Sequence, residues 1–451
     1  MKTLRTFLAL ICATTFVFAA EKPNIVYVLF DDMGYGEPGC YRSGSNLKTP
    51  NLDRFATQGM RFTDAHSASA VCTPTRYGIL TGRYPSRIGQ YGVLTSYNPP
   101  IIPDTRLTVA SLLKQHGYDT ACIGKWHLGL KWDVNEKKSA SPPVGASISS
   151  GPNQLGFDYF YGFTHARDIG SIIEQNKVVE HVKEAENQPK MLAKAVQWIE
   201  ARQEKTPFFL YFPMCPPHTP IAPSPDFIGK SGGIDAVKQD PQYSDWLYQG
   251  DHMLGKILET LDKKGFSKNT LVIVTSDNGA AARPYPPLRA AKTSIYEGGH
   301  RVPFLVRWPE KVQPGSVNDQ TICHNDLMAT CADLLEKKLP ADAGEDSVSF
   351  LPAILGRSKE ALREATIHQS VAGDLAIRRG MWKYIFFKNG NRELYHLAHD
   401  IGETKEVSAA NPEVVKELST LMQRYIIEGR STAGDKQPSS EKFMKLDHGK
   451  R

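Results

Sequence analysis

An Asn-x-Ser/Thr acceptor is absent from all 451 residues of the sequence, so nothing marks the chain for N-glycosylation in a eukaryotic secretory route. Beyond the first twenty residues, no apolar run is long enough to span a bilayer, and we expect no transmembrane anchor. The seven cysteines include no CxxC pair and fall at irregular spacings, which disfavours both a disulfide framework and a structural zinc site. The formal charge of +6 is spread along the chain, so we expect no nucleic-acid partner.

The first twenty residues have the pattern of a secretory signal peptide. Lys2 and Arg5 precede an apolar run from Phe7 to Ala20 that ends in small residues. We therefore predict a signal peptide over residues 1–20 and a protein exported to the periplasm or the extracellular space. The chain as a whole is 41% hydrophobic and 23% charged, which is typical of a globular protein with one large domain and a smaller one.

Short apolar runs of strand length each end in polar residues. "NIVYVLF" (24–30), "DTACIG" (119–124), "FFLYFPM" (208–214) and "TLVIVTS" (270–276) show no alternation of polar and apolar residues, as in strands of a sheet that is covered on both faces. The segments "TPNLDRFATQGM" and "LTVASLLKQHG" have helical spacing and a glycine stop. The pattern predicts an α/β fold with a mostly parallel sheet, whose ligands bind beyond the carboxyl ends of the strands.

The composition changes after about residue 355. "ATIHQSV", "LAIRRG", "WKYIFF" and "RELYHL" predict a run of short strands, and "PEVVKELSTLMQRYIIEG" predicts a closing amphipathic helix. We therefore expect a large domain over residues 21–355 and a smaller antiparallel α+β domain over residues 356–451.

Acidic and amide side chains follow two of the predicted strands. Asp31 and Asp32 follow the first run, where an aspartate is more often a helix cap. Asp277 and Asn278 stand in "SDNG", which alone is an ordinary turn sequence. Together they offer three carboxylates and an amide oxygen at neighbouring strand ends, and this all-oxygen set suits a hard divalent cation such as Ca²⁺ or Mg²⁺.

Four basic side chains near the other strand ends are individually weak signals. Lys125 and His127 in "GKWHLG" point to the same side of an extended segment, yet such a pair is more often solvated surface. His218 in "PPHTP" is as readily a structural loop histidine. Lys292 precedes "YEGGHRVPF", whose paired glycines predict a tight turn or a close backbone approach.

Cys72 stands in "AVCTPTRYGILTG", a Cys-x-Pro-x-Arg sequence that ends at Arg76. This segment and "GYDTACIGKWH" closely resemble the two signature segments of the type I sulfatases. The stretches "TPNLDRFATQGMRFT", "SDNG" and "YEGGHRVPF" follow in family order, so that the resemblance covers most of residues 24 to 310. The chain is similar to sulfatases of the arylsulfatase A and N-acetylgalactosamine-sulfatase kind, which implies an alkaline-phosphatase-like sandwich fold and a catalytic role for residues 21–355.

The resemblance implies a specific chemistry for Cys72. In the family this cysteine is oxidised by a formylglycine-generating maturation enzyme, and the hydrated aldehyde is the nucleophile that attacks sulfur. The metal ion, Ca²⁺ or possibly Mg²⁺, would be held by Asp31, Asp32, Asp277, Asn278 and the modified Cys72.

The same resemblance implies roles for the basic residues. Arg76 would steady the hydrate, and Lys125 would pair with the hydrate and with a sulfate oxygen. His127 would be the base that releases sulfate, while His218 and Lys292 would assist the leaving alcohol.

The substrate follows less directly. The export signal and the proline-rich loops favour a sulfated small molecule or glycan, with His165 and Arg167 as candidate walls of its subsite. Two departures from the family pattern are Glu37, where aspartate is common, and "YFPMCPPH" before His218. The alternatives are a phosphate ester hydrolase of the same superfamily and an unmodified protein that binds sulfated glycans without catalysis.

Overall fold

The computed structural model describes residues 22–133, 141–234, 237–358 and 360–441. The predicted signal peptide lies outside these residues. Among the described residues, no helix combines the length and the apolar character that crossing a membrane requires.

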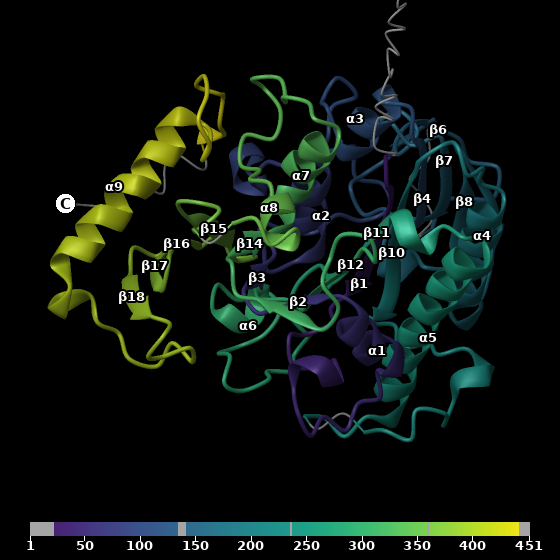
Figure 1. Ribbon diagram of the computed structural model, residues 1–451, viewed down its shortest axis with the longest axis horizontal. Coiled ribbons are helices and arrows are strands. Elements are labelled where there is room, and N and C mark those ends of the chain that lie inside the picture. Colours follow the sequence, from purple (N-terminus) through teal and green to yellow (C-terminus); the bar gives the residue numbers. More distant parts are fainter. Residues whose placement is uncertain (1–21, 134–140, 235–236, 359, 442–451) are drawn as a thin grey trace, which may run out of the picture.

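A ten-stranded sheet forms the centre of the larger part of the chain (Figure 1). In spatial order its strands are β13 (Ser316–Asn318), β2 (Met60–Phe62), β12 (Phe304–Arg307), β11 (Thr270–Ser276), β1 (Asn24–Asp31), β10 (Phe208–Pro217), β4 (Asp119–Lys125), β7 (Tyr159–Phe163), β8 (Ser171–Glu174) and β9 (Lys177–His181). The five strands from β11 to β7 run parallel, and β12 and β8 pair with them antiparallel at the two sides. The four apolar runs predicted as strands are β1, β4, β10 and β11, so the mostly parallel sheet is confirmed.

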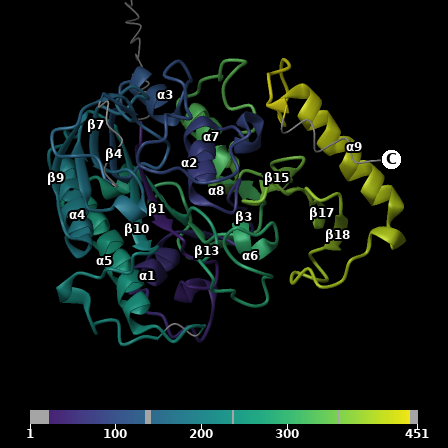
Figure 2. The same ribbon diagram turned by 180° about the vertical axis from the view of Figure 1, so that it is seen from behind.

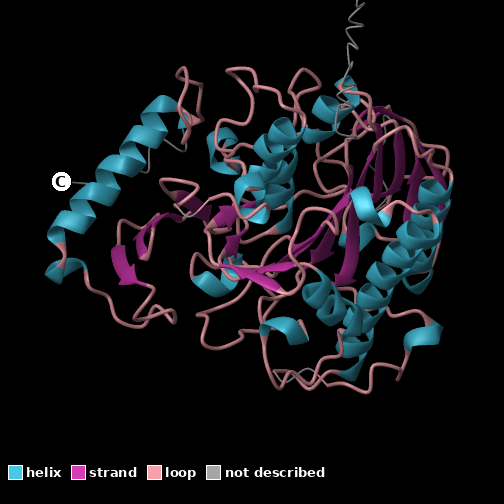
Figure 3. Cartoon of the chain, viewed as in Figure 1, coloured by secondary structure: helices cyan, strands magenta, loops and turns pink. Residues whose placement is uncertain are grey.

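Helices cover both faces of this sheet (Figures 1 and 3). One face packs on α2 (Cys72–Thr81), α3 (Val109–Gln115), α7 (Leu327–Leu334) and α8 (Leu351–Ile354), and the other on α1 (Pro50–Gln58), α4 (Glu184–Glu200) and α5 (Pro241–Lys263). Successive residues of β1 alternate between the two cores, because Tyr27 and Leu29 belong to the first and Val28 and Phe30 to the second. Burial on both sides explains why the strands read as continuous apolar runs.

A small antiparallel sheet and one long helix form the C-terminal part of the described chain (Figure 2). The elements are β15 (Thr366–Gln369), β16 (Leu375–Arg379), β17 (Trp382–Phe386), β18 (Arg392–His396) and α9 (Pro412–Glu428). Leu418 and Leu421 of α9 pack in one cluster with Leu375 and Ile377 of β16. The predicted short strands and the closing amphipathic helix are therefore confirmed. Shorter elements are β3 (Ala65–His66), β5 (Lys131–Trp132), β6 (Ile148–Ser150), β14 (Ile322–Cys323) and α6 (Glu297–His300).

Buried ion pairs connect the C-terminal sheet to the larger part. Lys383 of β17 contacts Glu297 of α6 at 3.1 Å and Glu403 at 2.7 Å, and Arg378 of β16 contacts Asp64 at 2.6 Å. All these side chains are nearly inaccessible to solvent. Because a buried charge that loses its partner is costly, these pairs fix how the two parts dock.

Three buried histidines lie at the same junction. His66 of β3, His300 of α6 and His368 of β15 contact one another, and the rings of His300 and His368 stack with centroids 3.9 Å apart. Burial lowers the pKa of each of the three imidazoles. The groups that face them are the carboxylates of Asp64 and Glu297 and the cations of Arg378 and Lys383.

We expect the stability of the protein to fall as the pH drops below about 6.5. Because the folded-state pKa of each histidine lies below its unfolded value, the unfolded chain takes up protons first, and each histidine weakens folding by up to about 1.4 kcal/mol per pH unit. Thermal unfolding of His368→Phe, which keeps an aromatic ring but cannot titrate, should show a shallower fall of Tm between pH 7.5 and 5.5. The matched variant His399→Phe changes an exposed ring and should keep the slope of the parent protein. Equal slopes in all three proteins would contradict this assignment.

Candidate active site

The acidic residues predicted at the strand ends come together. Asp31 ends β1 and Asp277 follows β11, its parallel neighbour, so both lie at the same edge of the sheet. The backbone N–H of Asp32 donates to Asp277 Oδ1 at 3.1 Å, and Asn278 Nδ2 donates to Asp32 Oδ1 at 2.7 Å. Asp32 has a φ of 67°, a left-handed conformation that aspartate tolerates better than most residues.

Close backbone approach explains the glycines around these acids. A Cβ on Gly279, the residue after Asn278, would lie 1.9 Å from the carbonyl oxygen of Gly298, and one on Gly299 would lie 2.1 Å from that of Ser294. The backbone N–H of Gly279 donates to Gly299 O at 2.9 Å. The close backbone approach predicted from the paired glycines is confirmed. It places the segment that follows Lys292 next to the acidic cluster.

Cys72 is the first residue of α2, a helix whose residues are all buried. Arg76 lies one turn later on the same side of the helix. Its Nη2 donates to Asp277 Oδ2 at 2.8 Å and lies 3.6 Å from Asp31 Oδ1, while its Nη1 donates to the carbonyl of Lys125 at 3.0 Å. Arg76 therefore joins the ends of α2, β1, β4 and β11. Burial raises the pKa of the Cys72 thiol, so an unmodified thiol at this position stays protonated.

The C-terminal sheet reaches the backbone beside Cys72. Ala70 donates its N–H to the carbonyl of Gln369 in β15 at 2.9 Å, and its own carbonyl accepts from Thr293 at 2.8 Å. Val371 in turn donates to the carbonyl of Thr293 at 3.2 Å. These bonds tie the residue before Val71 and Cys72 to a segment almost 300 residues later in the chain, and the residue after Lys292 to the same segment.

Two lysines neutralise the acids. Lys125, the last residue of β4, donates to Asp31 Oδ2, and Lys292 Nζ lies 2.6 and 2.7 Å from the two oxygens of Asp32. Burial alone would raise the pKa of Asp31, but the nearby charges of Lys125, His218 and Arg76 outweigh it and lower the pKa to about 2. Burial alone would lower the pKa of Lys292, but the carboxylates raise it well above its ordinary range. Three carboxylates thus meet three cations.

Several atoms of this cluster fit a divalent metal ion. Asn278 Oδ1 and Asp31 Oδ1 are buried without a hydrogen-bond partner among the described residues, and an unpaired buried acceptor is costly unless it binds an ion or water. The ligand atoms of Asp31, Cys72 and Asp277 lie within 4.8 Å of one another. Oxygen ligands of this kind suit a hard cation, and the residues present therefore fit the metal that the sequence predicts.

His127 offers one free nitrogen to this site. Its Nε2 lies 2.9 Å from the carbonyl of Leu94, so Nε2 carries the proton and Nδ1 is left as an acceptor. Nδ1 is buried without a partner among the described residues. Burial lowers the pKa of His127 well below its ordinary range, which keeps the ring neutral. The arrangement leaves Nδ1 available as a base.

His218 has the opposite arrangement. It follows β10, and its Nδ1 is bonded to the carbonyl of Thr219, which leaves Nε2 to face the site 3.6 Å from Asp32 Oδ2. The side chain is 15% exposed, so Nε2 lies where the buried cluster opens to solvent. Nε2 is therefore the nitrogen left to exchange a proton with a ligand.

The two candidate wall residues differ. His165 stacks on His127 with centroids 5.8 Å apart, and both its nitrogens are occupied, because Nδ1 accepts from the N–H of Arg167 and Nε2 bonds to Ser96. It can therefore present only its ring to a ligand. Arg167 is exposed. Its backbone N–H donates to His165, and its side chain makes no hydrogen bond or ion pair with the described residues.

Sequence reasoning missed the residues that orient these side chains. Ser96 bonds to His165 and donates to Asp168 at 2.6 Å. Glu37, which the sequence marked only as a departure from the family pattern, accepts from the hydroxyls of Tyr243 and Tyr285 and from the N–H of Gly34. The loop that carries Ser96 has no periodicity, so the sequence gives no signal for its role.

The buried histidines at the domain junction do not form a second metal centre of the same quality. His66, His300 and His368 bring their nitrogens close together, but the rings of His300 and His368 are inclined by only 8° and stand 3.9 Å apart. A metal ion lies near the plane of each imidazole that binds it, so two stacked rings cannot share one ion. Lys383 and Arg378 also supply positive charge at this place.

Comparison with known proteins agrees with the geometry. The family model for Sulfatase matches residues 23–337, and that for the C-terminal part of N-sulphoglucosamine sulphohydrolase matches residues 290–430. The chain is 31% identical to N-acetylgalactosamine-6-O-sulfatase of Bacteroides thetaiotaomicron over 90% of this chain and 93% of that protein. It is also 31% identical to human arylsulfatase A over 89% of this chain and 87% of that protein.

A solved structure connected with glycosaminoglycan metabolism in Bacteroides thetaiotaomicron superposes with a TM-score of 0.80. It is 30% identical to this chain, and the match covers 90% of this chain and 99% of the other. The predicted sandwich fold of the alkaline-phosphatase kind is thereby confirmed.

We expect a divalent cation to stabilise the folded protein through the strand-end acids. Binding to the native state alone raises stability by RT ln(1 + [L]/Kd), about 2.7 kcal/mol at a hundredfold excess over Kd. The Tm of the parent protein should therefore rise with added Ca²⁺ or Mg²⁺, and Asp277→Asn should lose most of that rise. Glu37→Gln is the matched control, because it alters a buried carboxylate nearby that is fully hydrogen-bonded. A cation-dependent rise of the same size in Asp277→Asn would exclude the site.

Proposed function

The chain belongs to the sulfatase family and is a sulfuric ester hydrolase, and we propose that it cleaves sulfated carbohydrates with a formylglycine made from Cys72. The observation that carries the proposal is the position of Cys72, whose Sγ shares a buried cluster with carboxylate oxygens of Asp31 and Asp277. In the mature protein, the oxygens of the hydrated aldehyde would stand where Sγ lies here. A thiol held protonated by burial is a poor nucleophile, which favours the modified residue.

Calcium is the proposed ion, with magnesium as the other candidate. Asp31, Asp32, Asp277 and Asn278 would hold it together with the modified Cys72. Carboxylate and amide oxygens without thiol or imidazole favour Ca²⁺ or Mg²⁺, and Ca²⁺ tolerates the irregular geometry of a site built from several segments. When bound, the ion would acidify the nucleophilic hydroxyl and draw charge from the sulfuryl oxygens.

The charges of the site support this assignment. The carboxylates of Asp31, Asp32 and Asp277 are formally balanced by Lys125, Lys292 and Arg76. A divalent cation adds two positive charges, which a sulfate monoester and an ionised hydroxyl cancel. The buried charges therefore cancel when both substrate and nucleophile are in place, apart from the proton that His218 supplies where the site opens to solvent.

The first step transfers the sulfuryl group to residue 72. One hydroxyl of the hydrate, which has already lost its proton to solvent, attacks sulfur as an alkoxide while the bond from sulfur to the alcohol oxygen breaks. His218 Nε2 supplies the proton that the departing alkoxide takes up. Lys292, whose proton is held tightly, stabilises the developing charge on that oxygen without giving up its own proton.

The second step releases sulfate. His127 Nδ1 takes the proton from the remaining hydroxyl of residue 72. The oxygen of that hydroxyl then forms the aldehyde double bond, and the bond between the carbon and the sulfate oxygen breaks. Arg76 and Lys125 hold the residue in place during both steps. Water then adds to the aldehyde and restores the hydrate.

The carbohydrate substrate is supported by relatives and by the wall of the site. A relative at 31% identity over 90% of this chain is named for cleaving the 6-O-sulfate of N-acetylgalactosamine. The ring of His165, stacked on His127, offers an apolar face at the entrance, and Arg167 is exposed beside it. We also propose export to the periplasm or the extracellular space, on the pattern of residues 1–20.

We expect active protein to carry formylglycine at position 72. Mass spectrometry of the peptide that contains residue 72 should show the aldehyde or its hydrate in protein from its native host. Cys72→Ala should fold with the same Tm within about 2 °C and lose turnover entirely, because it has no nucleophile. A fully active sample that contains only the thiol would refute the mechanism.

The two histidines should respond differently to the leaving group. General acid assistance contributes about two to four decades and matters most for basic alcohols. His218→Ala should therefore slow a sugar sulfate more than a nitrophenyl sulfate, on the order of tenfold or more. His127→Ala should slow both by a similar factor and give a burst, because it acts after the alcohol has left. Equal losses on both substrates in His218→Ala would show that its role is assigned to the wrong step.

A further inference from the structure

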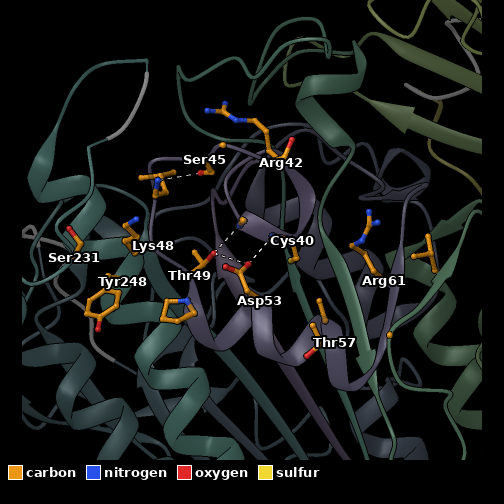
Figure 4. A pocket seen from close by; sticks show the side chains of 18 of the residues that line it. Cys40, Arg42, Ser45, Lys48, Thr49, Asp53, Thr57, Arg61, Ser231 and Tyr248 are labelled. Atoms are coloured by element: carbon orange, nitrogen blue, oxygen red, sulfur yellow. Dashed lines mark hydrogen bonds between the residues drawn. The ribbon is translucent and has the colours of Figure 1, made fainter.

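A cavity of about 820 Å³ lies apart from the catalytic residues, none of which lines it. Its walls come from the segment 39–61, which includes the short helix Gly39–Tyr41 and α1, from Lys230, Ser231 and Tyr248, and from the edge strand β13. Figure 4 shows Asp53 and Cys40 at its centre, with Lys48, Ser231 and Tyr248 on one side and Arg61 on the other. The volume lies within the usual range for ligand pockets, roughly 300–1,000 Å³.

The cavity is strongly basic. Arg42, Lys48, Arg61 and Lys230 line it, and none of these four cations has an ion pair with a carboxylate of the described chain. Arg42 and Arg61 lie instead over the rings of Tyr285 and Tyr41, at 5.1 and 5.3 Å from the ring centroids. Elsewhere in the protein, cations such as Arg87, Arg363 and Lys383 are paired. Cations gathered without partners around a cavity attract an anion.

The one acidic residue of the lining, Asp53, offsets one of the four positive charges and leaves an excess of three. Asp53 Oδ1 accepts from the N–H of Cys40 at 2.7 Å and from the hydroxyl of Thr49 at 3.3 Å. Thr49 in turn accepts from the N–H of Gly39 at 2.9 Å. Asp53 therefore holds the short helix Gly39–Tyr41 against α1, and its lone pairs are directed to the protein.

The remaining lining has the chemistry of a sugar site. Four serines line it: Ser45 and Ser316 donate their hydroxyls to carbonyls of the protein, Ser231 accepts from the N–H of Gly233 and keeps its own proton for a ligand, and Ser43 is exposed. The half-buried ring of Tyr248 supplies an aromatic surface. Hydroxyl groups can exchange hydrogen bonds with sugar hydroxyls. An aromatic ring provides a flat apolar face at low cost in conformational entropy.

Resting on the proposed function, we propose that this cavity binds an anionic sugar unit of the same sulfated polysaccharide, at a distance from the ester that is cleaved. The segment from Asp32 to Asp53 runs from the catalytic edge to the cavity, and Arg42 lies over Tyr285, whose hydroxyl donates to Glu37 in that segment. Under this proposal, a long substrate chain contacts the cavity and the catalytic site at the same time. Such a second contact raises the effective concentration of the substrate chain at the active site.

The direct test is binding of polymeric chondroitin sulfate and of heparin to the full chain with Cys72→Ala, in which no ester is cleaved. Lys48→Gln/Lys230→Gln removes two exposed cations of the cavity that make no ion pair with the described residues, so the fold should survive. The dissociation constant for at least one polymer should rise on the order of tenfold, and the slope of log K against log salt should shrink by roughly one to two. The matched control Lys337→Gln/Lys338→Gln removes two exposed lysines outside the cavity and should bind as the parent does.

Three results would overturn the proposal: no binding of either polymer by the parent, unchanged binding by the cavity variant, or an equal loss in the control. Arg61→Gln, on the opposite wall, is a second variant and should weaken binding in the same direction. In mature enzyme, the cavity variant should lower kcat/KM for a polymer relative to that for a monosaccharide sulfate. If no sulfated sugar is turned over, the proposed function fails, while the polymer binding of the Cys72→Ala proteins still decides this inference on its own.

Discussion

Like charges that meet inside a protein must be neutralised there, and this requirement organises the whole site. The parallel pairing of β1 and β11 brings Asp31, Asp32 and Asp277 to one buried edge, where their mutual repulsion is strong. The positive charges of Arg76 and the two lysines offset that repulsion, and each of the three side chains comes from a different element. The carboxylates therefore determine where α2, the end of β4 and the loop of Lys292 have to lie.

Neutrality also separates the roles of the basic groups. Lys292 and Arg76 hold their protons too tightly to exchange them, and they can act only through their charge. The two histidines, each with one nitrogen bonded to a backbone carbonyl, keep a single nitrogen for proton transfer. The direction of that nitrogen is set by the loops, so the chemistry depends on Leu94 and Thr219 as much as on the imidazoles.

Much of this could be predicted from the sequence because it is local or repeated. Uniform apolar runs identified β1, β4, β10 and β11, and the polar residues directly after them identified the edge at which ligands bind. The close backbone approach after Lys292 could be predicted from the paired glycines, because only glycine permits the contact of Gly279 with Gly298. The resemblance to sulfatases then supplied roles that no spacing could give.

The features that stayed hidden depend on residues far apart in the chain. His66, His300 and His368 meet through three elements whose local sequences carry no common signal. The basic cavity likewise joins the segment 39–61 to Lys230, Tyr248 and β13, so its unpaired charge appears only when the chain is folded. The antiparallel strands at both sides of the main sheet are short, and their pairing is set by neighbours rather than by their own pattern.

The hydrogen bonds from Ala70 N–H to the carbonyl of Gln369 and from Val371 N–H to the carbonyl of Thr293 have a consequence for the order of events during synthesis. Residue 72 leaves the ribosome long before residue 369, and at about 5–20 residues per second the delay is on the order of tens of seconds. Until β15 is made, the backbone that precedes Cys72 lacks one of its supports. Under the proposed maturation of Cys72, the interval before β15 (Thr366–Gln369) is made is the one in which the modifying enzyme would reach the cysteine, and synthesis of the last fifth of the chain would end it.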